Sequence, residues 1–275
     1  MSKLLSANFM RLKKDKFFWI GIIFMFAAGV LYPTMIYRDV QKTGIINTVD
    51  DAFCGCTLFI GVVMAVFCSL FIGTEYSDGT IRNKIAIGHT RTALYLSNAI
   101  VSATVSIFMC AAFFIPYLCI GIPLLGFFEM NTKLVFWFGL VSFLLAIAFS
   151  SIFTLIAMLN HNKPIAAIIC ILLAFLFLIA GIQINGMLSQ PKTIIGYTTS
   201  EDGQGEYIEL ENPKYLEGSE REVVQFLYDF IPGGQVAQCM SMEAVNIEKL
   251  PIYSLMIVVL STGVGLIFFK KKDLK

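Results

Sequence analysis

The sequence predicts an all-α integral membrane protein with six transmembrane helices and both termini in the cytoplasm. Of its 275 residues, 57% are hydrophobic and only 14% are charged, against about a quarter charged in soluble domains. Six uncharged stretches are long enough to span a bilayer, and the basic residues cluster between them on one side. The bilayer is therefore the expected solvent. With a net charge of only +1, the chain shows no sign of a nucleic-acid-binding surface.

The six predicted spans each supply about 20 mostly apolar residues, the length at which a helix satisfies its backbone polar groups across the bilayer. They are residues 17–37, 52–74, 93–116, 134–159, 165–183 and 252–269, and they contain no Asp, Glu, Lys, Arg or His. A charged group at the bilayer centre costs about 2.5–3.5 kcal/mol and is kept mainly where an ion or proton site needs it. This absence disfavours a proton-coupled carrier, whereas a sodium-coupled carrier that uses backbone carbonyls stays open.

The third span lies in an uncharged stretch, 92–128, that could be divided into two spans at Pro116. Six spans place 13 of the 20 basic residues inside, including those of both termini. A seventh span would place one basic terminus outside. We therefore expect residues 117–128 to form a re-entrant or interfacial piece.

Residues 1–16 mix leucine and phenylalanine with Arg11, Lys13 and Lys14. This pattern predicts an amphipathic helix on the inner leaflet, and a solvated basic tail is the alternative. The apolar stretch that follows is of span length and has no small-residue cleavage site, so we expect it to stay as a helix rather than to be a signal peptide.

The loop 186–250, between the fifth and sixth spans, is the largest outer feature and holds 11 acidic residues. It predicts an acidic extracellular subdomain. Ser219 and Glu222 have the spacing of a capping box, which predicts a helix that ends at Pro232-Gly233-Gly234. A second short helix is expected over 235–242. The first helix either roofs the transport path at the interface or packs against its own loop.

Catalytic, metal and nucleotide motifs are missing from the sequence. His89 and His161 fall in predicted cytoplasmic turns, and neither H-E-x-x-H nor G-x-S-x-G occurs. Cys54-Gly-Cys56 has no second cysteine pair or histidine beside it, so we expect no metal site. The phosphate-binding loop G-x-x-x-x-G-K-[ST] is also missing, so any use of ATP would have to be made by another polypeptide.

Small residues recur every four positions in the second span and form one stripe on that helix: Thr57, Gly61, Ala65, Ser69 and Gly73. The fourth span repeats the pattern with Ser142, Ala146, Ser150 and Thr154. Small residues let helix backbones approach closely in lipid. The stripes predict either a subunit interface or packing within one subunit.

The cytoplasmic hairpin 75–92, between the second and third spans, predicts a turn and then a short helix. Asp78-Gly79 favours a turn, Thr80 is placed to cap the helix, and Gly88 is placed to end it. Ile81 and Ile85 lie on one helix face, away from Arg82 and Lys84. Such a helix suits a cleft in a soluble partner, and a membrane-surface helix is the alternative.

The sequence of this hairpin is similar to a motif of a known transporter family. The stretch Glu75-Tyr-Ser-Asp-Gly-Thr-Ile-Arg-Asn-Lys84 resembles the signature Glu-x-x-x-Gly-Thr-[Ile/Leu]-[Arg/Lys] that follows the second span in permease subunits of type-2 ABC exporters. That group includes antibiotic-resistance and bacteriocin-immunity permeases. The predicted topology agrees with theirs. Residues 228–235, Tyr-Asp-Phe-Ile-Pro-Gly-Gly-Gln, are similar to a segment before the last span in Gram-positive members.

The resemblance implies a coupling helix that sits on a separate ATPase subunit, in a unit of two permeases and two ATPases. The implied coupling residues are Glu75, Gly79, Thr80, Ile81, Arg82, Lys84 and Ile85. His161 and Lys163, in the second cytoplasmic turn, would make a secondary contact. No residue is assigned to substrate.

The function expected from these features is a bacterial plasma-membrane permease that exports an amphipathic or hydrophobic cargo, such as an antimicrobial peptide or a drug. Uncharged spans rich in Phe and Met suit an apolar passenger. Two alternatives remain: a membrane-embedded sensor or scaffold with an acidic ligand-binding ectodomain, and an ion-coupled secondary carrier. The sequence does not establish the direction of transport, or whether two identical permeases or two different ones form the dimer.

Overall fold

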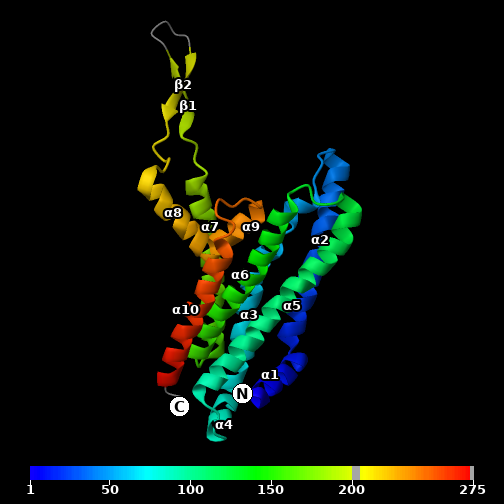
Figure 1. Cartoon of the computed structure of the whole chain (residues 1–275), viewed down its shortest axis with the longest axis vertical. Coiled ribbons are helices and arrows are strands. Elements are labelled where there is room, and N and C mark those ends of the chain that lie inside the picture. The colour runs from blue at the N-terminus through cyan, green and yellow to red at the C-terminus, as the bar shows by residue number, and fades with distance from the viewer. Residues whose placement is uncertain (200–204, 273–275) are drawn as a thin grey trace.

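The computed structural model describes residues 1–199 and 205–272, so Lys275 and the tip of the outer loop lie outside the described residues. Within it, six helices are long and apolar enough to cross a membrane, which confirms the predicted fold class (Figure 1). They are α2 (Lys16–Thr43), α3 (Cys56–Ser77), α5 (Arg91–Leu125), α6 (Thr132–Leu159), α7 (Lys163–Leu188) and α10 (Leu250–Lys271). The N-terminus, the end of α10 and α4 (Thr80–Ala86) lie at one end of the bundle, as an even number of spans requires.

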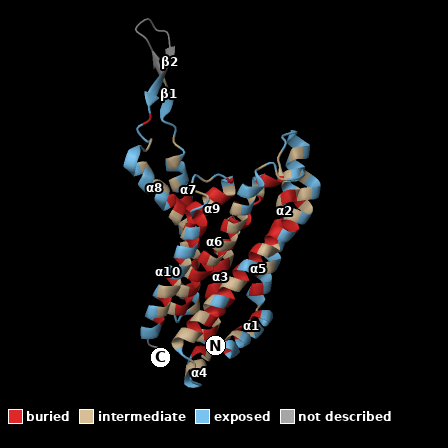
Figure 2. Ribbon diagram, in the orientation of Figure 1, coloured by how far each residue is buried: buried red, intermediate tan, exposed pale blue. Residues whose placement is uncertain are grey.

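The two central helices are α3 and α6, which have the largest buried shares of the six candidate spans (Figure 2). α3 packs against α2, α5, α6 and α7, and α6 also packs against α10. The small-residue stripe of α3 lies within this core. Gly61 faces the ring of Phe149, and Gly73 faces the side chain of Lys163. The stripe therefore serves packing inside one chain and is not available to a second subunit.

The expected break in the third span does not occur. α5 runs without interruption from Arg91 to Leu125, past Pro116, and its 35 residues correspond to about 52 Å of helix. Residues beyond Pro116 still have packing partners, because the buried Tyr117 donates a hydrogen bond to the carbonyl oxygen of Val49 (2.6 Å), in the 3₁₀ turn η1 (Val49–Ala52). The helix stops at Gly126, whose φ is 90°. The prediction of a re-entrant piece over 117–128 is therefore wrong, because residues 117–125 continue the helix. That this end of α5 lies at the membrane interface stays a prediction.

The N-terminal segment is helical, as predicted, and forms α1 (Ser2–Lys14). Leu4, Asn8 and Leu12 are buried on one face, and the helix packs against α5. Asp15 then caps α2 by accepting a hydrogen bond from the backbone N–H of Phe18 (2.9 Å). This packing excludes a solvated tail.

The outer region contains a feature that the sequence did not predict, an antiparallel β-hairpin of β1 (Thr193–Thr199) and β2 (Gly205–Glu211). It is followed by α8 (Gly218–Phe230). The expected capping box is wrong, because α8 starts at Gly218 and Ser219 already lies inside the helix. α8 ends just before Pro232, as expected, but α9 (Pro232–Ser241) starts three residues earlier than the predicted 235.

The junction of α8 and α9 is packed tightly against α7. A Cβ on Gly233 would overlap the backbone carbonyl of Phe177, so only glycine allows this approach. Gln235 donates to the carbonyl oxygen of Asp229 (2.9 Å) and accepts from the hydroxyl of Ser254 in α10 (2.6 Å). Much of α9 is buried in the main core. The segment 228–235 thus fastens the outer loop to the bundle.

Candidate functional site

The candidate site is the hairpin between α3 and α5, at the end of the bundle that holds both termini. Gly79 makes the turn after α3 with a φ of 66°, in the left-handed region that favours glycine. α4 follows at once. Thr80 does not cap α4 as predicted, because it is the first helical residue, and its hydroxyl donates to the carbonyl oxygen of Glu75 instead (3.0 Å).

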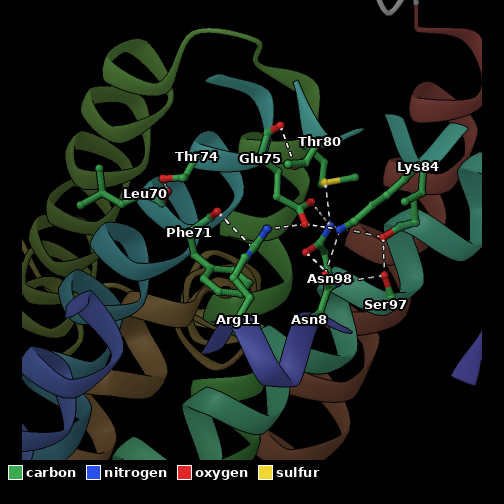
Figure 3. Close-up of polar contacts among 12 residues, drawn as sticks. Asn8, Arg11, Leu70, Phe71, Thr74, Glu75, Thr80, Lys84, Ser97 and Asn98 are labelled. Atoms are coloured by element: carbon green, nitrogen blue, oxygen red, sulfur yellow. Dashed lines mark hydrogen bonds and ion pairs between the residues drawn. The ribbon is translucent and has the colours of Figure 1, made fainter. Parts of the chain in front are cut away.

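Glu75 is the centre of a buried polar network that joins four helices (Figure 3). Its side chain is fully buried and forms ion pairs with Arg11 of α1 and Lys84 of α4. The other carboxylate oxygen accepts a hydrogen bond from the Asn98 amide of α5 (3.0 Å). A buried carboxylate is stable only when paired and hydrogen-bonded in this way.

Asn8 closes the network from α1. Its side-chain amide donates to the hydroxyl of Ser97 (3.2 Å) and to the side-chain oxygen of Asn98 (3.4 Å), while its own oxygen accepts from Lys84 (3.0 Å). Figure 3 shows these side chains converging from α1, α4 and α5. We call Asn8, Arg11, Glu75, Lys84 and Asn98 the Glu75 clamp.

Arg11 is held on three sides. It pairs with Glu75, donates to the carbonyl oxygen of Phe71 (3.2 Å), and lies over the Phe71 ring, with the guanidinium carbon 3.6 Å from the ring centroid. Burial lowers the pKa of Arg11 from its ordinary value, and the charge of Glu75 opposes that change. The stacked guanidinium therefore ties α1 to the end of α3.

The two faces of α4 are used differently from the prediction. Ile81 is buried and Ile85 packs against the core, so the apolar face expected to dock on a partner turns into the bundle instead. The reason is that α4 lies against α3 and α5, where Ile81 and Ile85 join the apolar core. The outward face carries Arg82 and Asn83, and Ile87 just after the helix is 78% exposed.

The second turn at this end, between α6 and α7, holds His161 and Lys163. His161 is exposed and its ring lies edge-on to Tyr76, with 5.3 Å between centroids. Lys163 turns inward and donates to the hydroxyl of Thr74 (2.8 Å). Only His161 of this pair is thus placed to meet a partner.

The end of α10 is tied to the same region. Arg91, at the start of α5, donates to the carbonyl oxygens of Lys270 (2.9 Å) and Lys272. The Lys272 ammonium donates to the Tyr76 hydroxyl (2.8 Å) and to the carbonyl oxygen of Met158 (2.9 Å). Burial lowers the pKa of Lys272 to about 8.

Sequence reasoning included Glu75 and Lys84 but missed their partners. Asn8 is a polar residue between Leu4 and Leu12 on the apolar face of an amphipathic helix. Ser97 and Asn98 were polar residues near the start of an apolar span. Each was a signal, but only the structure shows that they meet at one carboxylate. Within the described residues, no group of three His, Cys, Asp or Glu side chains is placed to hold a metal ion.

The decisive comparison concerns the segment that builds this site. A family profile described as ABC-2 family transporter protein matches residues 4–181, more than half of the chain, and includes α1, the hairpin and the whole Glu75 clamp. The chain belongs to the ABC-2 transporter permease family. No curated protein sequence matches it.

As a member of this family with six apolar helices, the protein is a multi-pass protein of the plasma membrane and the transport subunit of an ABC transporter. In such a transporter the permease is not itself catalytic; its partners are an ATPase subunit and the membrane lipid. The Glu75 clamp therefore lies in the part of the fold that the family shares.

Proposed function

We propose that this permease exports an amphipathic or hydrophobic cargo, such as an antimicrobial peptide, and that a separate ATPase subunit drives it through α4. ATP and Mg²⁺ would be bound by that subunit. A second copy of the permease or a paralogue would complete the transport path.

The observation that carries the proposal is the Glu75 clamp. α4 has only seven residues, and if it were joined to the bundle by its backbone alone, a displacement of α4 would move the bundle little. Lys84 instead fastens it through Glu75 to α1, α3 and α5. A displacement of α4 would thus be passed to three helices, as coupling through packed and ion-paired contacts requires.

By exposure and contacts, the proposed coupling residues fall into two groups. Arg82, with Asn83 and Ile87, is exposed and would contact the ATPase, with His161 as a secondary contact. The others would act by position. Gly79 and Thr80 shape the turn, Ile81 and Ile85 pack α4 against the bundle, and Glu75 and Lys84 pair to hold it there. Lys163 holds the second turn against α3 through Thr74. We expect the first group to determine how tightly the ATPase binds, and the second to determine how well a displacement of α4 is passed to the bundle.

A sensor with a self-contained ectodomain fits the structure less well. α9 is buried among the membrane helices, with Val236 and Cys239 in the same core as α3 and α6. Residues 186–250 would therefore not be expected to bind a ligand when expressed alone. An ion-coupled carrier would transport in vesicles without ATP.

The test is to express the permease with the ATPase encoded beside its gene, and to measure ATP-dependent transport of a fluorescent amphipathic peptide into inside-out vesicles. Arg82→Glu and Ile87→Ser should each reduce transport and ATPase co-purification by about tenfold or more, as for a central interface residue. Ile46→Ser, a change of an equally exposed isoleucine at the other end, is the matched control. Unchanged transport in the first two variants would overturn the proposed role of α4.

A further inference from the structure

The outer end of the permease carries a pocket of about 530 Å³, on the opposite end of the bundle from α4. Its walls come from the start of α6, the end of α7, α8, α9 and the segment after α9. Apolar surface is provided by Leu134, Phe138 and Leu188, and polar groups by Arg221, Tyr228 and Gln238. We call it the outer pocket. It lies outside the segment matched by the family profile, apart from the α6 side.

Two polar atoms of this pocket are buried without a hydrogen-bond partner in the described part of the chain: Nη1 of Arg221 and Oε1 of Gln238. Gln238 is only 1% exposed, and its amide nitrogen donates to the carbonyl oxygen of Tyr228 (3.3 Å). Arg221 uses Nη2 to donate to the carbonyl oxygen of Leu188 (3.1 Å). Because nearly all buried polar atoms are paired in folded proteins, two such atoms in one pocket indicate a ligand with matching groups.

The neighbouring polar groups are already engaged. Tyr228 donates to the side-chain oxygen of Asn185 (2.9 Å), and burial raises the pKa of Tyr228 to about 12, so it remains a neutral donor. Gln225 donates to the carboxylate of Asp229 (2.8 Å). The ligand is therefore specified by one cationic donor, one neutral acceptor and an apolar wall.

We propose that the outer pocket binds the carboxyl terminus of a peptide whose last residue is apolar. The terminal carboxylate would accept from Arg221, the anion being the best partner for a buried guanidinium. The backbone N–H of the last residue would donate to Gln238. Its side chain would pack on Leu134, Phe138 and Leu188. One terminal residue thus supplies an anion, an N–H and an apolar body.

The charge around the pocket suits the rest of such a peptide. Glu243 is exposed on the lining, and the loop 186–250 carries 11 acidic residues against four basic ones. Upstream basic residues of an amphipathic peptide would be attracted to this surface. The inference rests on the proposed function for the class of cargo, but the binding itself needs no ATPase.

The test uses the full-length permease in nanodiscs of zwitterionic lipid, without the ATPase. Two fluorescein-labelled hexapeptides ending in Ile-Leu are compared by anisotropy, one with a free carboxylate and one with a terminal carboxamide. The free acid should bind about tenfold or more tightly, the usual effect of a hydrogen bond to a charged group. This comparison leaves the protein unchanged, so a misfolded variant cannot imitate the result.

Arg221→Gln should abolish the preference for the free acid, and Gln238→Leu should weaken the binding of both peptides, because both carry the backbone N–H that Gln238 accepts. Lys249→Gln should keep both the preference and the affinity. Lys249 is the matched control, since it lies in the adjacent pocket beside Asp229 and its loss removes the same charge. Equal binding of the two peptides, or no binding of either, would overturn the proposal. Displacement of the free-acid peptide by glycerol phosphate as readily as by unlabelled peptide would also overturn it, since it would indicate a site for a lipid headgroup. Loss of ATPase co-purification would leave these results unaffected, so the two proposals fail separately.

Discussion

The substitution Glu75→Gln tests the clamp at its centre. It keeps the shape of the side chain but leaves Arg11 and Lys84 beside a neutral amide. Breaking a buried ion pair by removing one partner costs about 3–5 kcal/mol. The Arg11 and Lys84 side chains are 30% and 18% exposed, and an amide oxygen still accepts from one of them, so we expect about 2–4 kcal/mol here.

The assay is amide hydrogen exchange of the purified permease, read separately for α1, α4 and the outer end of α5. Exchange should speed up in α1 and α4, because the clamp fastens both, and stay unchanged at the outer end of α5. Glu248→Gln is the matched control, because Glu248 forms only an exposed pair with Lys133 at 3.9 Å. If Glu75→Gln leaves α1 and α4 as protected as the control does, the clamp does not hold α4.

Three further predictions follow from the same structure. Gly79→Ala should lower the free energy of unfolding by about 1–2 kcal/mol and speed up amide exchange in α4, because alanine is strained at this positive φ. Gly44→Ala, at φ 71°, introduces the same strain but should leave exchange in α4 unchanged. Equal acceleration of α4 exchange in the two variants would contradict this. Gly233→Ala should destabilise the permease by about 3 kcal/mol or more in thermal unfolding, since its Cβ would overlap the Phe177 carbonyl; a wild-type midpoint would refute that packing. The pKa of Lys272 is about 8, below its ordinary 10.5, so between these two pH values the undocked end holds more protons than the docked end. Docking of the end of α10 should therefore strengthen as pH rises from about 8 to 10.5. The acetylation rate of Lys272, followed by mass spectrometry, should rise with a midpoint near pH 8; a midpoint near 10.5 would show that it is not buried.

The membrane architecture was predictable because it follows from one strong constraint. In lipid every backbone polar group needs a partner within the segment, so apolar stretches of span length can be identified directly from the sequence. The error over 117–128 has the same origin. The sequence suggests a break at Pro116, but a proline inside a membrane helix is tolerated when neighbouring groups satisfy the freed backbone groups. Here the hydrogen bond of Tyr117 to Val49 holds the continuation of the helix in place.

The hairpin shows where sequence reasoning ends. The spacing of Ile81 and Ile85 predicted an apolar face, but periodicity does not tell whether that face meets a partner or the same chain. The assignment of Glu75 to a docking motif had the same limit, because its burial depends on Arg11, 64 residues earlier, and on Asn98. Small residues at Gly61 and Gly73 likewise predicted close packing without naming the neighbour.

The β-hairpin and the outer pocket were beyond prediction for a different reason. β1 and β2 are short, and among the described residues they pair with each other alone. Their sequence gives a weak signal within an acidic loop. The pocket needs Arg221 and Gln238 to be brought together by α8 and α9, whose junction depends on the close approach of Gly233 to α7.

The central claim is that the exposed edge of α4 is where the ATPase transmits its motion. The most direct measurement places a photo-crosslinking amino acid at Ile87 and, as a control, at Ile46, in cells that produce the ATPase subunit. We predict an adduct from Ile87 with a subunit that carries a phosphate-binding loop, and none from Ile46. An ATPase adduct from Ile46, or none from Ile87 in a complex that purifies intact, would contradict the account.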